Sequence, residues 1–503
     1  MSRLVRLAAL AIVVADLGVT GCTPPGPVQA GNGTLRIAAA LPRARIPESG
    51  MGTVVSFLAK DGLVANSPDG HPQPNLAESW TWDPTRTRLR LRLRDGVLFH
   101  NGQKLTAALA AESLRQSLAS ERVVSFGGVT AITPIDDSTL EIALRQPDSF
   151  LLPDLASVVI QYPSDHEIGT GPFRIRENSS ASARLYAFDK YYKGRPALDA
   201  IDIQTYDTQR KAWAAMLRGD ADVLHDVSRD AADFVEAETR VKTYTFPRAY
   251  YIALAFNIRN PVLKDPAVRR AINRAIDRNL MVVDGLRGRG KSADGPVWPD
   301  HWAYSPPKHP FRYDPDAARA ELDAAHFPIR QDEAGGMPRR FSFNCLMYAD
   351  DTRFDRTALL LQKELYEIGI DMKLEPVTLM DLSSRGASGD FDAFLFEFVS
   401  GKNLGWIYAF WHTPGEKPFI DTGYHAADNV LDGIRHAVSD EDVRKGIVTL
   451  NDVLSFDPPA AFIAWPSQAR AASRRVEIPD EPNRDILQTA RRWRFSNQYE
   501  AKR

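Results

Sequence analysis

At roughly 150 residues per domain, a chain of 503 residues has room for about two to four domains and a large hydrophobic core. Hydrophobic residues make up 44% and charged residues 25%, which is ordinary for a soluble globular protein and excludes a largely disordered chain. Lysine and arginine (62) nearly balance aspartate and glutamate (64), so no strong overall field would draw the chain to nucleic acid. Two cysteines exclude a disulfide framework and disfavour a cysteine-based zinc site.

Residues 1–21 have the pattern of a signal peptide. Two arginines precede an apolar run that is too short to span a bilayer comfortably. The segment Val19-Thr-Gly-Cys22 resembles a bacterial lipobox, which implies cleavage before Cys22 and lipidation of its thiol. The alternative is an ordinary secretory signal with a chance cysteine. Residues 22–34 are rich in proline and glycine and are predicted to form a flexible tether.

Strand-like and helix-like stretches alternate along the rest of the chain, which predicts an α/β fold. Leucines alternate with arginines over residues 88–94, and this period of two predicts a half-buried strand. We interpret its basic face as solvent-exposed, and the alternative is an arginine stripe that binds phosphates. The segment Trp80-Thr-Trp82 is expected to pair with this strand as a hairpin across the turn at Asp83-Pro84.

Four helix starts carry capping signals. Thr106 is a plausible N-cap for a helix through about residue 118. Asp265-Pro266 places an N-cap and an N1 proline before a predicted helix whose apolar residues keep helical spacing as far as Leu280. Asp314-Pro315 predicts the start of another helix in the same way. Ser439 and Asp442 have the spacing of a capping box before a further amphipathic helix.

The stretch from 340 to 400 predicts a β-α-β-α-β unit with parallel strands and right-handed crossovers. Its predicted strands are 341–347, 370–377 and 391–399, and its helices are 354–368 and about 379–385. Cys345, in the first of these strands, is predicted to be a buried free thiol. Ligands of open α/β sheets bind beyond the carboxyl ends of the strands, which points to residues 400–406.

Tests for catalytic chemistry are negative. Residues 285–292 fit the P-loop pattern, but a predicted helix precedes them and a Gly-Pro turn follows, so the strand-loop-helix context for phosphate binding is missing. The sequence contains no recognisable nucleophile–base pair and no histidines at metal-ligand spacing on a helix. We therefore predict a protein that is not an enzyme and requires no cofactor or metal.

Aromatic residues gather in segments that could line a cleft. Tyr250 and Tyr251 begin a strand-like run, Trp406 and Tyr408 follow the loop beyond the third strand, and residues 298–302 add two tryptophans. Aromatic rings with a few polar groups are typical of small-molecule sites. Core packing is the alternative for each ring.

Several short blocks of sequence, taken in order, resemble a known family. They are Leu76–Trp80, Leu93–Gly102, Gly169–Phe173, Tyr191–Pro196, Gly219–Asp222, Leu254–Asn257, Val268–Ile272 and Ala275–Arg278. Over residues 35 to about 475 the chain resembles the extracellular solute-binding proteins of family 5, the peptide/nickel-type binding components of ABC importers.

The resemblance implies a periplasmic-binding-protein fold with two lobes, open and mostly parallel sheets, and a hinge of two segments. The implied crossings lie near 246–259 and 464–472. The implied divisions are lobe I (35–74, 166–256 and 473–503), an extra subdomain within it (75–165), and lobe II (257–472).

The implied function is capture of a peptide or similar small solute between the lobes and its delivery to membrane permease subunits. The implied protein is an extracytoplasmic monomer, held by its lipid anchor in the periplasm or on the outer face of the cytoplasmic membrane. The alternatives are an exported hydrolase and a non-transport sensor on the same fold.

The resemblance also implies which residues contact the solute. One group is the first loop with Ser49, Gly50 and Met51, and the other surrounds the loop after 391–399. In peptide binders that loop carries an aspartate for the ligand's ammonium group, and here this aspartate is absent. The expected contacts on this side are Tyr250, Tyr251, Glu397, Asn403, Trp406 and Tyr408, with Glu397 as the candidate substitute for the aspartate.

Overall fold

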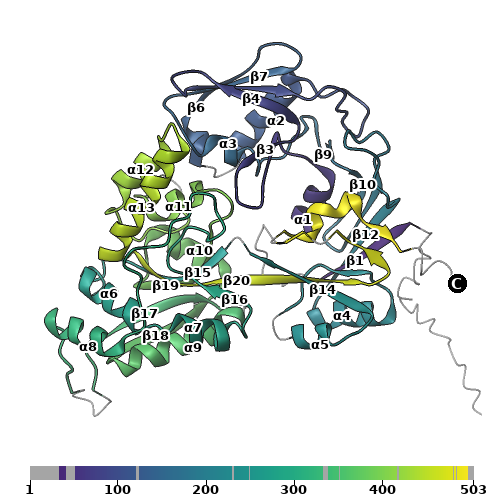
Figure 1. Cartoon of the computed structure of the whole chain (residues 1–503). Coiled ribbons are helices and arrows are strands. Elements are labelled where there is room, and N and C mark those ends of the chain that lie inside the picture. The colour runs from purple at the N-terminus through teal and green to yellow at the C-terminus, as the bar shows by residue number, and fades with distance from the viewer. Residues whose placement is uncertain are drawn as a thin grey trace, which may run out of the picture. The chain divides into compact units, whose positions relative to one another are not determined.

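The computed structural model describes residues 33–40, 51–120, 124–228, 231–248, 250–331, 338–349, 352–415, 418–479, 481–482 and 484–496 (Figure 1). The predicted signal peptide, Cys22 and nearly all of the predicted tether lie outside these residues. Within the described part, no helix is long and apolar enough to cross a membrane.

The largest sheet has 12 strands in the described part of the chain. From edge to edge it runs β10 (Phe173–Asn178), β11 (Ser182–Ala187), β12 (Ala200–Tyr206), β1 (Thr34–Ala40), β13 (Val223–Leu224), β20 (Ala460–Ser473), β15 (Tyr250–Phe256), β19 (Ala393–Val399), β17 (Phe341–Tyr348) and β18 (Ile370–Val377). Two further strands, β14 (Val241–Pro247) and β16 (Gly290–Ser292), pair with β20. We call the half with β1 and β10–β13 lobe I, and the half with β15–β19 lobe II.

The α/β class is confirmed, but the sheet is mixed where the sequence predicted mostly parallel strands. The parallel pairs are those of β1 with β12 and β13, and of β17 with β18 and β19. The pairs of β13, β14, β15 and β16 with β20, and of β15 with β19, are antiparallel. The reason is that the chain passes from lobe I to lobe II through β14 and β15 and returns through β20.

Strand β20 belongs to both lobes. Its residues 460–464 pair with β15 and its residues 467–473 pair with β14. Accordingly, Trp465 packs in the core of lobe II, whereas Ala469 packs in a core cluster of lobe I. The two crossing segments thus lie side by side, as expected for a two-segment hinge.

The predicted β-α-β-α-β unit is confirmed. It consists of β17, α9 (Thr352–Glu367), β18, α10 (Leu379–Ser388) and β19. Gly369 has φ of +85°, a left-handed conformation that ends α9. Cys345 is buried and free, and burial raises the pKa of its thiol to about 12. Strand β19 lies between β17 and β15, so its nearly continuous apolar sequence matches its central place.

A separate four-stranded sheet forms the β4–β7 subdomain, in the order β4 (Ala77–Trp82), β5 (Arg88–Leu93), β7 (Thr139–Leu144) and β6 (Val129–Pro134). The predicted hairpin of β4 and β5 is confirmed, and the leucines of β5 are buried. Arg88 and Arg90 pair with Glu141, and Arg92 pairs with Glu78. The three arginines of the exposed basic face are therefore paired with two carboxylates within the sheet, and this favours a structural role over phosphate binding. Helix α2 (Ala107–Ser120) begins after Thr106, whose Oγ1 accepts from the amide of Leu109 as predicted.

The capping signals locate the helices of lobe II well, with one error. Helices α8 (Pro315–Ala324) and α13 (Asp440–Phe456) begin after Asp314 and Ser439, whose side chains accept backbone hydrogen bonds. The long helix predicted after Asp265 is instead divided into α6 (Pro266–Ala275) and α7 (Arg278–Leu280). Asp277 causes the break, because its carboxylate accepts from two following amides and starts a new helix.

The remaining helices and short strand pairs cover the sheets. They are α1 (Met51–Ala59), α3 (Leu151–Asp154), α4 (Gln209–Arg218), α5 (Ala232–Glu236), α11 (Gly405–Trp411), α12 (Asp428–Arg435), the 3₁₀ segments η2 (Val124–Gly128) and η4 (Ile486–Arg492), the π-helical segment η3 (Met281–Gly285), and the pairs β2 (Val64–Asn66) with β3 (Pro72–Pro74), β8 (Gln161–Tyr162) with β9 (Asp165–Gly169), and β21 (Val476–Glu477) with β22 (Arg494–Phe495).

Residues of the family-like blocks hold the crossing strands in place. The buried guanidinium of Arg278 donates to the carbonyl of Phe462 (2.7 Å) in β20 and to the carbonyl and side chain of Asn273 (3.0 and 2.7 Å). Asp222, whose side chain is fully buried, accepts from the backbone and side chain of Arg36 in β1. These positions therefore support the framework rather than contact a solute.

Candidate functional site

The loop that follows β19, residues 400–404, is the place where the carboxyl-end rule predicts a ligand. Ser400 Oγ donates to the carbonyl of Pro296 (2.9 Å), and Gly401 adopts a left-handed conformation with φ of +65°. The chain then enters α11 at Gly405. The carbonyl of Lys402 packs against Gly70, where an added Cβ would lie 2.9 Å from it. Segments from distant parts of the sequence therefore meet at this loop.

Asn403 connects the loop to the β4–β7 subdomain through a buried carboxyl group. Its side-chain amide donates to Asp154, and its Oδ1 accepts from the amide of Gly405 (2.8 Å). Ser125 donates to the other oxygen of Asp154. Burial raises the pKa of Asp154 to about 8, so the carboxyl group is largely protonated at neutral pH. The contact is thus a network of neutral hydrogen bonds.

We expect Asp154→Asn to remove one component of the pH dependence of stability. The folded-state pKa lies above the unfolded value of about 3.9, so this carboxyl's contribution is fully present below about pH 4 and is lost as the pH rises through about 8. An amide of the same shape keeps both contacts at every pH, because its Oδ1 accepts from Asn403 and its Nδ2 can donate to the hydroxyl oxygen of Ser125. Melting temperatures at pH 6 to 9 should fall for the wild type relative to the variant, and parallel curves would contradict the assignment.

A second contact docks the same subdomain on lobe II. Arg435, at the end of α12, donates to Asp148 (2.8 Å), and the two side chains are only 15% and 3% exposed. The amide of Ser149 donates to the carbonyl of Arg435 (2.7 Å). Phe150 enters the core of lobe II and meets Tyr408 edge to face at 6.1 Å between ring centroids. The docking is therefore buried and specific.

A cavity of about 340 Å³ lies between these two contacts, beside the loop. Residues 71, 72, 80, 82, 86, 147–150 and 152–153 line it from one side, and residues 301–302, 402–404, 437–440 and 443 line it from the other. Its aromatic lining residues are His71, Trp80, Trp82, Phe150, His301 and Trp302. A volume of this size fits a small organic solute, because ligand pockets typically measure about 300–1,000 Å³.

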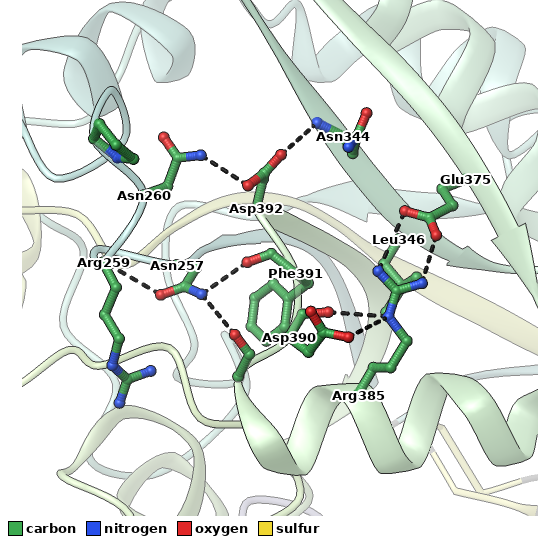
Figure 2. A pocket seen from close by; sticks show the side chains of 12 residues that line it. Asn257, Arg259, Asn260, Asn344, Leu346, Glu375, Arg385, Asp390, Phe391 and Asp392 are labelled. Carbon is green, nitrogen blue, oxygen red and sulfur yellow. Dashed lines mark hydrogen bonds and ion pairs between the residues drawn. The ribbon is translucent and has the colours of Figure 1, made fainter.

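Another cavity of about 340 Å³ lies at the opposite end of β19 (Figure 2). Here Asn257 donates to the carbonyls of Gly389 and Phe391 (2.9 and 2.7 Å), and Arg385 lies between Glu375 and Asp390. The polar groups of this cavity mainly satisfy one another and join the ends of strands. We therefore place the candidate site at the carboxyl end of β19 rather than here.

Of the predicted site residues outside the loop after β19, those that the structure describes lie mainly in the cores of the two lobes. Ser49 and Gly50 lie outside the described residues, and Met51 is buried at the start of α1 within the core of lobe I. Tyr251 is fully buried in lobe II, and its hydroxyl accepts from Trp411 Nε1 (2.9 Å). The core-packing alternative therefore describes the surroundings of Tyr251, and Met51 packs in a core as well. Tyr250 is half-buried, with the Arg248 guanidinium 4.1 Å from its ring centroid.

Glu397 is buried and ion-paired with Arg248, from the connection between the two crossing strands β14 and β15. Its carboxylate is therefore already engaged by a cation of this chain. Trp406 is half-buried and stacks on Phe410 at 6.0 Å between centroids. Tyr408 donates to Asp432 (2.9 Å) and lies against Arg435, so it takes part in the docking contact.

Sequence reasoning missed Arg248, Asp154 and His71 at the site. No local pattern marks them, because each lies in a turn or short segment far from the loop in sequence. Trp302, in contrast, carried a signal as one of two tryptophans in a proline-rich loop. It lines the cavity and stacks on His71 with 4.9 Å between centroids.

Comparisons with known proteins agree with this architecture. A model of the bacterial extracellular solute-binding proteins, family 5 (middle), matches residues 71–416. A glutathione-binding protein of Pectobacterium atrosepticum is 26% identical over 330 residues, which cover 62% of each chain. An oligopeptide-binding protein of Bacillus subtilis is 24% identical over 439 residues, which cover 80% of each chain.

Solved structures share the fold. The structure of NikZ from Campylobacter jejuni in complex with Ni(L-His) has a TM-score of 0.77 at 21% identity and covers 92% of this chain and 100% of its own. The Bacillus subtilis oligopeptide-binding protein AppA, in complex with a nonapeptide, has a TM-score of 0.76 at 20% identity, with 93% and 100% covered.

Proposed function

Because the chain belongs to the bacterial extracellular solute-binding proteins of family 5, we propose that it is the solute-binding component of an ABC importer. It captures a small solute between its lobes and delivers it to permease subunits in the membrane. It acts by binding and closure, without catalysis. The domain divisions predicted from the sequence, including the subdomain of residues 75–165, are part of this proposal, except that β15 packs in the core of lobe II and Ala469 of β20 packs in lobe I.

The observation that supports the proposal most directly is the cavity beside loop 400–404. Segments of the β4–β7 subdomain and of lobe II line it. Because the predicted divisions place this subdomain within lobe I, a bound solute would contact both of the lobes that the crossing strands join. Closure requires a ligand that contacts both sides, because a ligand shifts an equilibrium only by its differential affinity for the two states. Among the described cavities, this one meets that requirement at the carboxyl end of a central strand.

The substrate is a peptide or a similar small solute. Relatives and similar structures that are described as binding glutathione, oligopeptides and a nickel–histidine complex support this breadth. An unmodified peptide is the weaker candidate, because the expected aspartate is absent and Glu397 is engaged by Arg248. A solute without a free ammonium group avoids this difficulty.

We also propose that the mature protein begins at Cys22 and is a lipid-anchored monomer outside the cytoplasm. The lipobox-like segment 19–22 supports the anchor. Mass spectrometry of the membrane-associated protein should find a diacylglyceryl-modified cysteine at its N-terminus. An unmodified terminus at another residue would contradict it.

Thermal melting of the de-lipidated protein against peptides, sugars, amino acids and nickel chelates tests the binding function. A ligand at 100 times its Kd should stabilise the fold by about 2.7 kcal/mol. We expect a selective rise in melting temperature with one class of solute. A complete absence of shifts, at concentrations up to the solubility of each solute, would count against a receptor.

Trp406→Ala should weaken binding of the solute found in that screen by about tenfold, while the fold remains intact. The ring is half-buried and belongs to the second residue of α11, two positions after the lining residue Leu404, so its loss removes aromatic surface without opening the core. Calorimetric titration measures the affinity, and Tyr366→Ala, an exposed ring on α9, serves as control. Equal affinity in a well-folded Trp406→Ala protein would remove this residue from the site.

A further inference from the structure

The charge of Lys402 is the feature of the cavity that the fold does not explain. Lys402 lies in the loop after β19, lines the cavity and is only partly exposed. Among the ion pairs of the described residues, none involves its ammonium group. A partly desolvated ammonium group without a carboxylate is costly, unless a bound anion compensates it.

The groups near Lys402 are occupied elsewhere or carry the same charge. Asp69 accepts from Ser67 and lies 3.0 Å from His71 Nδ1; its charge favours the Lys402 ammonium group but forms no ion pair with it. Arg484 of lobe I is close enough to repel Lys402. Burial, with this repulsion, lowers the pKa of Lys402 to about 8. The environment therefore favours an added negative charge.

The other charged residues of the cavity agree with this sign. Arg86 adds a second cation, with its guanidinium 5.7 Å from the ring centroid of Trp82. Of the two lining carboxylates, Asp148 is neutralised by Arg435. Asp440 is exposed in the first turn of α13. A cationic solute would thus meet two cations and only one carboxylate that is open to it.

The aromatic residues of the lining indicate the chemistry of the uncharged part of the solute. Trp80, Trp82 and Trp302 are half-buried and present ring surface that the core does not use fully. Trp302 stacks on His71, which orients its ring. Flat aromatic walls favour a planar or apolar group, because such a group stacks on the rings and displaces water.

We propose that this cavity binds an anionic solute, with the ammonium group of Lys402 as counter-ion and the three tryptophan rings against a planar or apolar part of the solute. The inference rests on the proposed receptor function and specifies its substrate class. A carboxylate and a phosphate ester would both supply the anion.

Matched probes test the sign of the charge. Indole-3-acetate and N-acetylphenylalanine carry a carboxylate, their primary amides are neutral, tryptamine is cationic, and phenyl phosphate carries the phosphate ester. Thermal shift and calorimetric titration of the full mature chain would compare them. We expect an anionic probe to bind at least about tenfold more tightly than its neutral or cationic counterpart. Whether the carboxylates or phenyl phosphate bind more tightly identifies which of the two anionic groups the solute carries.

Variants of Lys402 test the residue. Lys402→Met should weaken binding of the anionic probe by about tenfold or more, whereas Lys402→Arg should retain most of it. Lys373→Met, an exposed lysine on β18, is the matched control and should bind as the wild type does. Melting of the unliganded variants establishes that each is folded. Unchanged affinity in Lys402→Met would overturn the proposal.

The pH profile separates a counter-ion from a structural role. The charges of Asp69 and Arg484 act on Lys402, and burial lowers the pKa of the neighbouring His301 to about 4. Asp154, which contacts the adjacent Asn403, has a pKa raised to about 8 and is common to the wild type and to Lys402→Arg. Affinity for the anion should fall as the pH rises through about 8 and Lys402 loses its charge, and the fall should be clearly smaller in Lys402→Arg, whose charge persists. Equal falls in the two proteins would contradict the role of Lys402. A flat wild-type profile would contradict the role.

The results that would contradict the anionic solute differ from those that would contradict the receptor function. Preferential binding of a neutral or cationic solute would overturn this inference and leave the receptor function in place. Absence of binding by every probe and by every solute of the wider screen would count against both.

Discussion

Arg435→Met is expected to release the β4–β7 subdomain from lobe II. The substitution removes the cation that pairs with Asp148, whose side chain is 3% exposed. Truncating one partner of such a buried pair typically costs about 3–5 kcal/mol, because the other charge stays buried or must take a proton. Burial already raises the pKa of Asp148, so protonation would follow readily. The destabilisation should therefore appear at the contact between the β4–β7 subdomain and lobe II, while the hydrophobic cores of both stay folded.

Hydrogen exchange can locate this effect. The amide of Ser149 donates to the carbonyl of Arg435, so its exchange should quicken strongly in the variant. Amides of β17 and β18, in the core of lobe II, should exchange as before. Lys445→Met, which removes an exposed pair with Glu441 on α13, is the control. Wild-type protection at Ser149 would show that the ion pair does not hold the docking.

Arg278→Met is expected to destabilise lobe II itself, by about 3 kcal/mol. The substitution leaves the carbonyls of Phe462 and Asn273 and the side-chain oxygen of Asn273 without their donor. Each buried unsatisfied acceptor costs about 1–3 kcal/mol, and the released desolvation cost of the guanidinium offsets part of the sum. Because one acceptor belongs to β20, the crossing strand should loosen as well.

Calorimetric melting measures this loss as a fall of several degrees in the transition of lobe II. Arg319→Met, whose guanidinium forms an exposed pair with Asp316, should leave the transition almost unchanged. Arg278→Lys should lie between the two, since a single ammonium cannot reach all three acceptors. Equal stability of Arg278→Met and Arg319→Met would contradict the structural role of this arginine.

The elements that could be predicted from the sequence are those with local signals. The alternation of leucine and arginine in β5 and the capping residues before α8 and α13 each depend on neighbours a few positions away. The division of the helix at Asp277 was missed because its apolar spacing continues across the break. Here a side-chain cap prevailed over periodicity.

The sequence predicted where the site lies but not which partners its residues contact. The order of strands pointed to residues 400–406, and the cavity lies there. The partners of the predicted residues were not predictable, since Arg248 meets Glu397 and Asp154 meets Asn403 across more than a hundred positions of sequence. Tyr251 was predicted to contact the solute but is fully buried. The sequence pattern of an aromatic residue near the start of a strand is the same whether the ring faces a cleft or the core.

Uptake by cells is the measurement that tests the central claim most directly. A labelled solute that binds the purified protein would be supplied to cells with the intact gene, to cells without it, and to the latter complemented with wild-type or Lys402→Met protein. We predict that uptake falls to background without the gene, returns with the wild type and returns only weakly with the variant. Unchanged uptake without the gene, despite binding in vitro, would contradict an importer component and favour a sensor on the same fold.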